Sequence, residues 1–186
     1  MFRLSPSTNT WIKQLFALVI IGGALLVTAG LLFANSSYFN KRGHFIEQPI
    51  AFPHELHVNQ LGLDCRFCHT QVERNANAGI PSMETCYGCH REILSNTEFL
   101  KPVRESYTNK EALPWNRVNR LADHVYFHHA SHVRAGVACQ RCHGDVEHAP
   151  LMMKENELTM QWCLDCHRSQ KSPVREKLMD CNTCHR

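Results

Sequence analysis

The 186-residue sequence has little of what nucleic-acid binding and ordinary core packing require. It has no block of five or more basic residues, and 20 Lys and Arg against 17 Asp and Glu leave a net charge of only +3, so no nucleic-acid partner is indicated. No segment shows the apolar–polar alternation of a strand. The mean hydropathy is negative, which excludes a mostly membrane-embedded protein. Much of the apolar content lies near the N-terminus, so something other than a hydrophobic core must hold the remainder together.

One long apolar run lies near the N-terminus. Residues 15–34 contain no charge, and as a helix they span about 30 Å, the thickness of the bilayer hydrocarbon core. Arg3, Lys13 and the N-terminal amine precede the run, so the positive-inside rule places the N-terminus in the cytoplasm and the rest of the chain outside it. A signal peptide cleaved near 27–29 is the alternative, but the run is longer than a usual signal-peptide core. We therefore expect a retained, single-span anchor.

All ten cysteines belong to five copies of one motif, C-x-x-C-H. This motif is the attachment signature of c-type haem, and chance would give about 0.04 copies in a chain of this composition. The two thiols form thioethers with one porphyrin, and the adjoining histidine binds its iron. The sequence therefore predicts five covalently bound c-type haems. The thioether residues are Cys65, Cys68, Cys86, Cys89, Cys139, Cys142, Cys163, Cys166, Cys181 and Cys184, and the proximal iron ligands are His69, His90, His143, His167 and His185.

Two other uses of paired cysteines explain the pattern less well. Zinc sites do not require a histidine after every second cysteine. Pairs of the C-x-x-C type are poor structural disulfides and would leave the histidines unexplained. Haem also answers the shortage of core residues, because each porphyrin is a large apolar plate. We expect a mainly α-helical and irregular fold, with short helices and coil packed around five stacked haems.

The phrase F-x-H-x-x-H occurs twice, each time shortly before a haem motif. It spans residues 52–57 before Cys65 and residues 127–132 before Cys139. Histidines three positions apart lie on nearby faces of a helical turn, so one can bind the iron of its own haem while the other reaches a second haem. We expect Phe52 and Phe127 to pack against a porphyrin. The expected distal ligands are His54, His57, His129 and His132.

The fifth haem receives no histidine from these phrases. Its distal ligand could be Met160, Met152, Met153 or His148, and His44 and His124 are less favoured. A methionine would raise the potential of that haem relative to haems with two histidine ligands. An open iron site would permit small-molecule chemistry, but no acid–base cluster stands out, so we interpret the chain as an electron carrier without catalytic residues.

The spacing of the motifs divides the chain into segments. The longest interval lies between the second and third motifs, and Pro114 interrupts any long helix there. Helical spacing over 155–168 predicts a helix that carries the fourth motif. The expected segments are a cytoplasmic N-terminus and anchor (1–35), a linker (36–50), a dihaem module (51–92), a connecting segment (93–124) and a trihaem module (125–186).

The two phrases and the motif order resemble the class III (c3-type) multihaem cytochromes. Longer stretches extend the likeness: QPIAFPHELHVNQLGLDCRFCHTQVERNANAGIPSMETCYGCH, LADHVYFHHASHVRAGVACQRCHGDV and LTMQWCLDCHR. Together they resemble the pentahaem cytochrome c subunit of alternative complex III over most of residues 48–168. The resemblance implies a haem domain on the periplasmic side of the bacterial cytoplasmic membrane. It also implies an electron-transfer role within a respiratory or photosynthetic quinol:electron-acceptor oxidoreductase.

The same resemblance implies partners and ligands. The partners are an iron–sulfur subunit related to molybdopterin oxidoreductases, multi-span quinol-binding subunits and a monohaem cytochrome c, with electrons leaving towards a cytochrome c or a terminal oxidase. Carried over to this sequence, the four phrase histidines become distal ligands and Met160 becomes the fifth. Ala149 and His148 depart from the family pattern, which leaves the fifth ligand open.

Three other functions are alternatives. A stand-alone, membrane-anchored quinol dehydrogenase of the tetrahaem type has C-x-x-C-H-x-M in its first motif, whereas Thr70 and Gln71 follow His69 here. The hexahaem subunit of a quinone reductase complex from sulfate reducers is disfavoured, because it binds six haems and this sequence has five haem motifs. A stand-alone periplasmic wire or reductase predicts an exposed haem with a vacant site.

Overall fold

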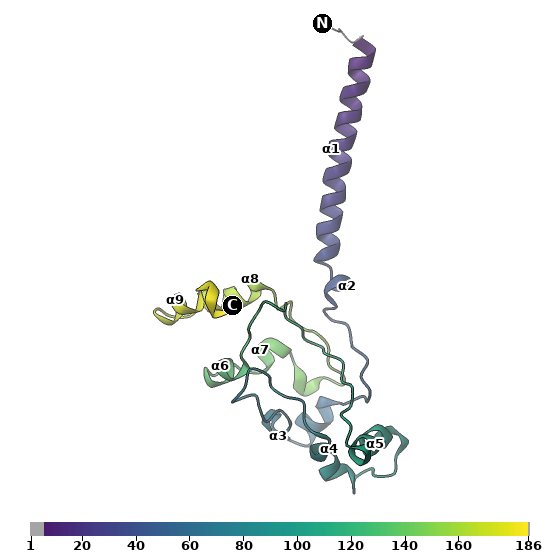
Figure 1. Ribbon diagram of the computed structural model, residues 1–186, viewed down its shortest axis with the longest axis vertical. Coiled ribbons are helices and arrows are strands. Elements are labelled where there is room, and N and C mark those ends of the chain that lie inside the picture. Colours follow the sequence, from purple (N-terminus) through teal and green to yellow (C-terminus); the bar gives the residue numbers. More distant parts are fainter. Residues whose placement is uncertain (1–5, 186) are drawn as a thin grey trace. The chain divides into compact units, whose positions relative to one another are not determined.

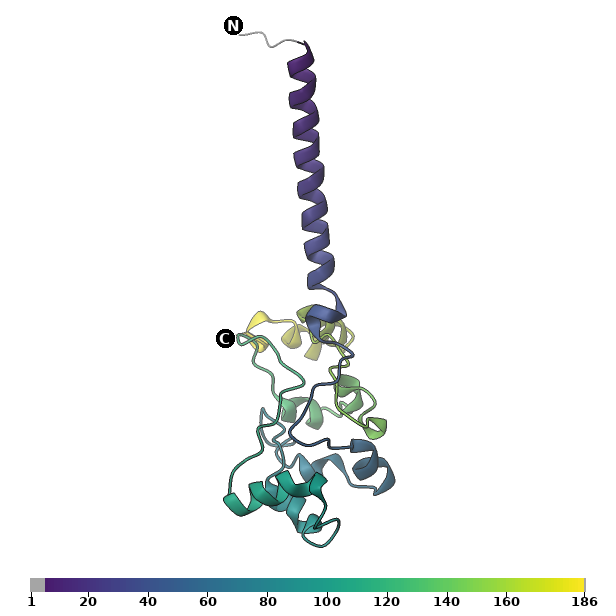
Figure 2. The same ribbon diagram turned by 90° about the vertical axis from the view of Figure 1, so that its right-hand side faces the viewer.

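The computed structural model describes residues 6–185 and consists of short helices and coil (Figures 1 and 2). Among these residues the only β-type pairing is one isolated bridge, between Phe45 and Met153. This confirms the mainly helical and irregular fold. The chain divides into two compact units between Arg42 and Gly43. Arg3, which enters the topology prediction, lies outside the described residues.

The first unit contains the predicted anchor helix. Helix α1 spans Pro6–Ala34, and a four-residue helix α2 follows over Ser37–Asn40, where the Ser36 hydroxyl accepts a hydrogen bond from the Phe39 amide at 3.3 Å. Helix α1 extends beyond the apolar run at its N-terminal side. Its apolar side chains are exposed all round, which is unfavourable in water and favourable in lipid. By length and composition, α1 is a candidate membrane anchor.

The second unit, residues 43–185, is built from eleven short helical elements in the described chain. In order, these are η1 (Glu55–Gln60), α3 (Cys65–Cys68), α4 (Met83–His90), η2 (Glu98–Leu100), α5 (Lys101–Asn109), α6 (His129–Arg134), α7 (Gln140–His143), η3 (Val146–His148), α8 (Met160–Arg168), α9 (Val174–Leu178) and η4 (Cys181–Thr183). None is long enough to be stable alone, so their stability must come from packing.

Residues 43–185 contain one small cluster of buried apolar side chains. Ile50, Leu100 and Val103 are 9%, 5% and 4% exposed, and Leu113 and Trp115 pack against them. The cluster holds η2 and α5 against the chain that leads into the first haem motif. Five apolar residues in all are buried in the described chain. That is far too few for a unit of this size, as the composition predicts.

Hydrogen bonds between coil segments supply further long-range order. Asn116 and Gln48 exchange two of them, at 2.8 and 2.9 Å, between the side-chain amide of Gln48 and the backbone of Asn116. The Gly43 amide donates to the Lys154 carbonyl at 2.9 Å. Segments far apart in sequence are thus joined without regular strands.

Two helices refine the sequence-based expectations. The helix predicted over 155–168 begins only at Met160, because the Thr159 hydroxyl accepts a hydrogen bond from the Trp162 amide and so caps the helix. Leu158, just before this cap, has a φ of 54° and ends any helical path from residue 155. The segment 93–124 contains η2 and α5, and Pro114 lies in the coil that follows. The module boundaries stay predictions.

The small cluster generates a stability prediction. We expect Leu100→Ala to lower the free energy of unfolding by about 2–4 kcal/mol, because a nearly buried leucine loses its contacts and leaves a cavity. Denaturant unfolding followed by far-ultraviolet circular dichroism measures this. Phe99→Ala is the matched control, since Phe99 is the preceding residue and is 54% exposed, and it should cost less than about 1 kcal/mol. Equal losses in the two variants would contradict the assignment of this cluster as the core.

Candidate functional site: five haem-binding motifs

Each C-x-x-C-H motif occupies a short helical turn. In the first, third and fifth motifs, the histidine amide donates to the carbonyl of the first cysteine, at 2.9, 3.0 and 2.9 Å. Aspartates cap two of these turns: Asp64 accepts from the Arg66 amide, and Asp180 accepts from the Asn182 amide, both at 2.8 Å. One turn therefore carries both thiols and the imidazole, as attachment of one porphyrin requires.

The thiols are arranged for neither of the alternative uses. All ten cysteines lie in the described part of the chain, and none forms a disulfide. Within residues 6–185, no group of three or more His, Cys, Asp or Glu side chains converges in a way that could hold a metal ion. The paired thiols thus remain available for thioether bonds.

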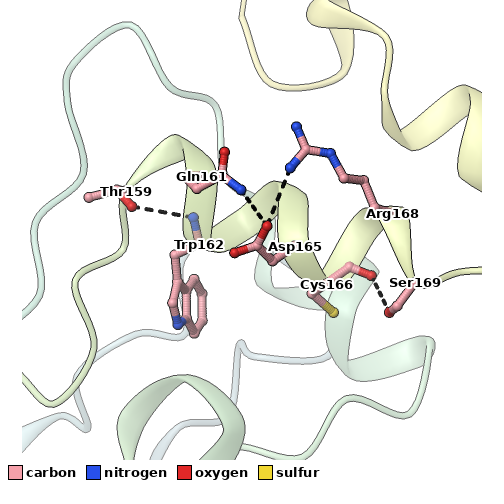
Figure 3. A network of polar contacts seen from close by, with 7 residues as sticks. All are labelled: Thr159, Gln161, Trp162, Asp165, Cys166, Arg168 and Ser169. Carbon is pink, nitrogen blue, oxygen red and sulfur yellow. Dashed lines mark hydrogen bonds and ion pairs between the residues drawn. The ribbon is translucent and has the colours of Figure 1, made fainter.

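The fourth motif shows how a polar surface fixes one of these turns (Figure 3). Asp165 accepts hydrogen bonds from Gln161 and, at 3.3 Å, from Arg168. The Ser169 hydroxyl donates to the Cys166 carbonyl at 2.7 Å and ends the helix. These contacts lie along the exposed side of α8. Exposed polar contacts contribute little stability, so these mark the solvent-facing side of α8 without fixing the helix in place.

Histidine burial separates the predicted ligands from the other histidines. The nine histidines predicted as iron ligands are all half-buried, and the remaining four, His44, His124, His128 and His148, are all exposed. Burial is the largest cause of the lowered pKa of His54, which falls to about 4, and of the lowered pKa values of His143 and His167. A low pKa keeps an imidazole neutral, which iron binding requires.

Three distal–proximal pairs face one another at a common distance. The ring centres are 6.2 Å apart for His57 and His90, 6.4 Å for His129 and His143, and 6.3 Å for His132 and His167. Two imidazoles bound to one metal through nitrogens about 2 Å away have ring centres about 6 Å apart. The spacing of all three pairs therefore fits one iron between two histidines.

His54 belongs with the first motif. Among charged neighbours, His69 contributes most to lowering the pKa of His54, after burial itself. This arrangement fits the prediction that the first histidine of each phrase serves the motif that follows it and the second histidine serves the next motif along. The phenylalanines repeat as well: Phe52 stacks on His57 at 4.3 Å, and Phe127 stacks on His132 at 4.6 Å. These rings contact the phrase histidines, and their packing against a porphyrin stays a prediction.

Backbone carbonyls orient most of these rings. The Nδ1 atoms of six predicted ligands lie 2.7–3.1 Å from a backbone oxygen; examples are His69 with Gly79, His90 with Ile93, and His129 with Ala76. A carbonyl can only accept, so Nδ1 carries the proton and Nε2 keeps the free lone pair that binds iron. Such partners leave no trace in the sequence, because any residue supplies a carbonyl.

The fifth motif differs from the other four. His124 lies beside His185, with ring centres 5.5 Å apart, but the His124 carbonyl also accepts the Nδ1–H of His185 at 3.1 Å. Nδ1 points away from the iron, so a residue that holds it there lies on the proximal side and cannot also be the distal ligand. His124 therefore supports the ring of His185.

The remaining candidates for the fifth distal ligand lie in two places. His148, Met152 and Met153 line a pocket together with His143, beside the third motif. Met160 begins α8, is 67% exposed, and precedes Cys163 by about one helical turn. Cys184 of the fifth motif is close enough to Cys163 to raise its pKa, after the larger effect of burial. Met160 thus stays the prediction for this haem.

Comparison with known proteins gives two matches. Residues 125–186 match the family described as cytochrome c7 and related cytochrome c. The chain is also 32% identical over 152 residues to the menaquinone reductase multiheme cytochrome c subunit of Nitratidesulfovibrio vulgaris, an alignment that covers 75% of this chain and 68% of that protein. The chain is a multihaem c-type cytochrome. The cytochrome therefore carries covalently bound c-type haems, and the residues present fit that group.

The facing pairs predict the effect of removing one distal ligand. We expect His57→Ala and His132→Ala each to convert one haem from low to high spin, because each vacates one axial position while the haem stays attached by its thioethers. Electron paramagnetic resonance and optical spectra of the full-length cytochrome measure the change.

A neighbouring histidine supplies the control for this prediction. His128 is exposed and adjoins His129, and the Ser131 hydroxyl lies 3.4 Å from its Nδ1 atom. His128→Ala should leave every spin state unchanged. Unaltered spectra in both His57→Ala and His132→Ala would rule out the distal assignment.

Proposed function

We propose that this cytochrome is the membrane-anchored, pentahaem electron-transfer subunit of a quinol:electron-acceptor oxidoreductase of the alternative complex III type. It binds five c-type haems through the ten cysteines and five proximal histidines, with His54, His57, His129, His132 and Met160 as distal ligands. It has no catalytic residue of its own. Electrons from quinol, oxidised in other subunits, pass through it towards a cytochrome c or a terminal oxidase.

The observation that carries this proposal is the common spacing of the facing histidine pairs. An iron with a histidine on each side has no position left for a substrate, so it exchanges electrons only. Three pairs at 6.2–6.4 Å therefore support a carrier over an enzyme that acts at its haems. A quinone reductase subunit as a relative supports a quinone-linked role for the carrier.

The proposed topology follows from α1 and its flanking charge. Helix α1 crosses the bacterial cytoplasmic membrane once, with Lys13 towards the cytoplasm, and residues 43–185 lie on the periplasmic side. There the haem domain contacts an iron–sulfur subunit related to molybdopterin oxidoreductases, multi-span quinol-binding subunits and a monohaem cytochrome c.

A second candidate reverses the direction of electron flow. The name of the Nitratidesulfovibrio relative, a menaquinone reductase subunit, favours a complex in which the cytochrome delivers electrons to a quinone. The ligands and haem packing would serve either direction equally, because each step moves a single electron between neighbouring haems. Two observations distinguish these candidates: which subunits accompany the cytochrome, and whether the complex oxidises quinol or reduces quinone.

Purification of the native assembly tests the proposed function. We expect mild detergent extraction, purification through this chain and mass spectrometry to recover the iron–sulfur, multi-span and monohaem subunits. Added quinol should then reduce the haems. An assembly whose reduced haems instead reduce added quinone supports the second candidate. A cytochrome that emerges alone, yet is reduced by quinol, contradicts the proposal and supports a stand-alone quinol dehydrogenase.

The ligand assignment of Met160 has its own test. If its thioether binds the fifth iron, the near-infrared band of methionine–iron ligation is present in the wild-type cytochrome and disappears in Met160→Leu. Met152→Leu is the matched control and should keep the band. A band that persists in Met160→Leu moves the assignment to another methionine, and a wild-type spectrum without the band indicates a different ligand.

A further inference from the structure

We infer that the five haem-binding motifs form a line in the order second, first, third, fourth, fifth, so that the second and fifth motifs are its two ends. This order differs from the order in sequence, which would make the first motif an end. The inference rests on the proposed function for its meaning as an electron path, and on hydrogen bonds and ring contacts for its geometry.

The second and first motifs are joined through one helix. Helix η1 begins directly after His54 and contains His57. His57 faces His90 of the second motif at 6.2 Å, and the His57 carbonyl accepts a hydrogen bond at 3.0 Å from the amide of Leu63, two residues before the first motif. Two distal histidines three residues apart hold two haems within reach of one helical turn, so these motifs are neighbours.

The first motif also lies beside the third. The segment that follows the first motif accepts hydrogen bonds from the beginning of α6: the His129 amide donates to Ala76 at 3.1 Å and the Ala130 amide to Asn75 at 3.2 Å. His129 faces His143 of the third motif. These contacts between the first and third motifs involve no residue of the second motif.

The third and fourth motifs repeat the first arrangement. Helix α6 carries both His129, which faces the third motif, and His132, which faces His167 of the fourth motif at 6.3 Å. The Asn156 side-chain amide, which precedes α8, donates to the Cys142 carbonyl of the third motif at 2.9 Å. One helical turn again joins two haem positions.

The fifth motif follows the fourth. Helix α9, which precedes the fifth motif, contacts α8, which carries the fourth. The Cys184 carbonyl accepts from the Tyr126 amide at 2.8 Å, which ties the fifth motif to the chain just before α6. In both Figures 1 and 2, the yellow C-terminal elements lie at one end of residues 43–185 and the teal α4 and α5 at the other.

The two ends of the line have different surroundings. At the second motif, Tyr87 stacks on Tyr107 of α5 with ring centres 4.0 Å apart, and α5 packs on the small apolar cluster. At the fifth motif, η4 is exposed. Electrons enter at one end and leave at the other by single-electron steps between adjacent sites, in which no bond forms and no proton moves. Partners that exchange electrons with the cytochrome must therefore approach the second and fifth motifs.

Removal of one haem at a time tests the order. The full-length cytochrome is titrated with small redox mediators, and each remaining haem is followed by electron paramagnetic resonance. A haem alters the midpoint potential of its neighbours, because its charge changes with its oxidation state. Cys86→Ala with Cys89→Ala should therefore change the potential of one other haem, and Cys65→Ala with Cys68→Ala should change two.

The opposite counts would overturn the inference. An order that follows the sequence predicts two changed haems for the second-motif variant and one for the first-motif variant. Cys181→Ala with Cys184→Ala is the matched control, since the fifth motif is an end in both orders and its loss should change one haem. If the first-motif variant fails to mature, the second-motif variant still decides between one neighbour and two.

The mediators make this test independent of the proposed function. Five haems that titrate with mediators but are not reduced by quinol in the native assembly contradict the proposed function and leave the neighbour counts valid. Counts that disagree with the inferred order, in a cytochrome that quinol does reduce, contradict the order alone.

Discussion

The proposed function depends on one interaction above all, the pairing of two imidazoles at the spacing that one iron ion between them would require. Residues 43–185 have a hydrophobic core of only a few side chains, so chain segments are positioned mainly by what they present to the haems. A pair such as His132 and His167 joins α6 to α8, and a pair such as His57 and His90 joins η1 to α4. On the proposed ligand assignment, an iron bound by such a pair would cross-link two short helices that would not be stable alone.

Backbone carbonyls around the histidines hold the imidazole rings in the orientation that iron binding would need. The carbonyl of Gly79 holds the ring of His69, and the carbonyl of Ala76 holds that of His129, each at 2.7 Å. A carbonyl that holds Nδ1 fixes the orientation of the ring and leaves Nε2 free to bind an iron. The backbone also turns sharply directly after the third motif. Gly144 leads the chain away from His143 with a φ of 74°, a conformation that glycine adopts without strain.

Much of the candidate site follows from the sequence because its signals are local. The C-x-x-C-H motifs and the repeated phrases lie within one or two helical turns, and so the thioether residues and the proximal and phrase histidines can be named without a structure. The role of His124 could not be predicted, because its carbonyl and not its side chain contacts His185. Helix α8 starts at Met160 because Thr159 caps it. In the sequence, this capping signal is weaker than the apolar spacing, which predicted an earlier start. The order of the motifs in space also escaped the sequence, since it depends on long-range hydrogen bonds between coil segments.

The repeated phrase has a structural consequence. Residues 52–90 and 127–167 have the same plan, in which a phrase is followed by two haem motifs. In each copy the second phrase histidine lies in one short helix, η1 or α6, and faces the histidine of the second motif of that copy. The part of the chain that carries the first four motifs is therefore an internal repeat of one unit, and the backbone hydrogen bonds from His129 and Ala130 to Ala76 and Asn75 join its two copies.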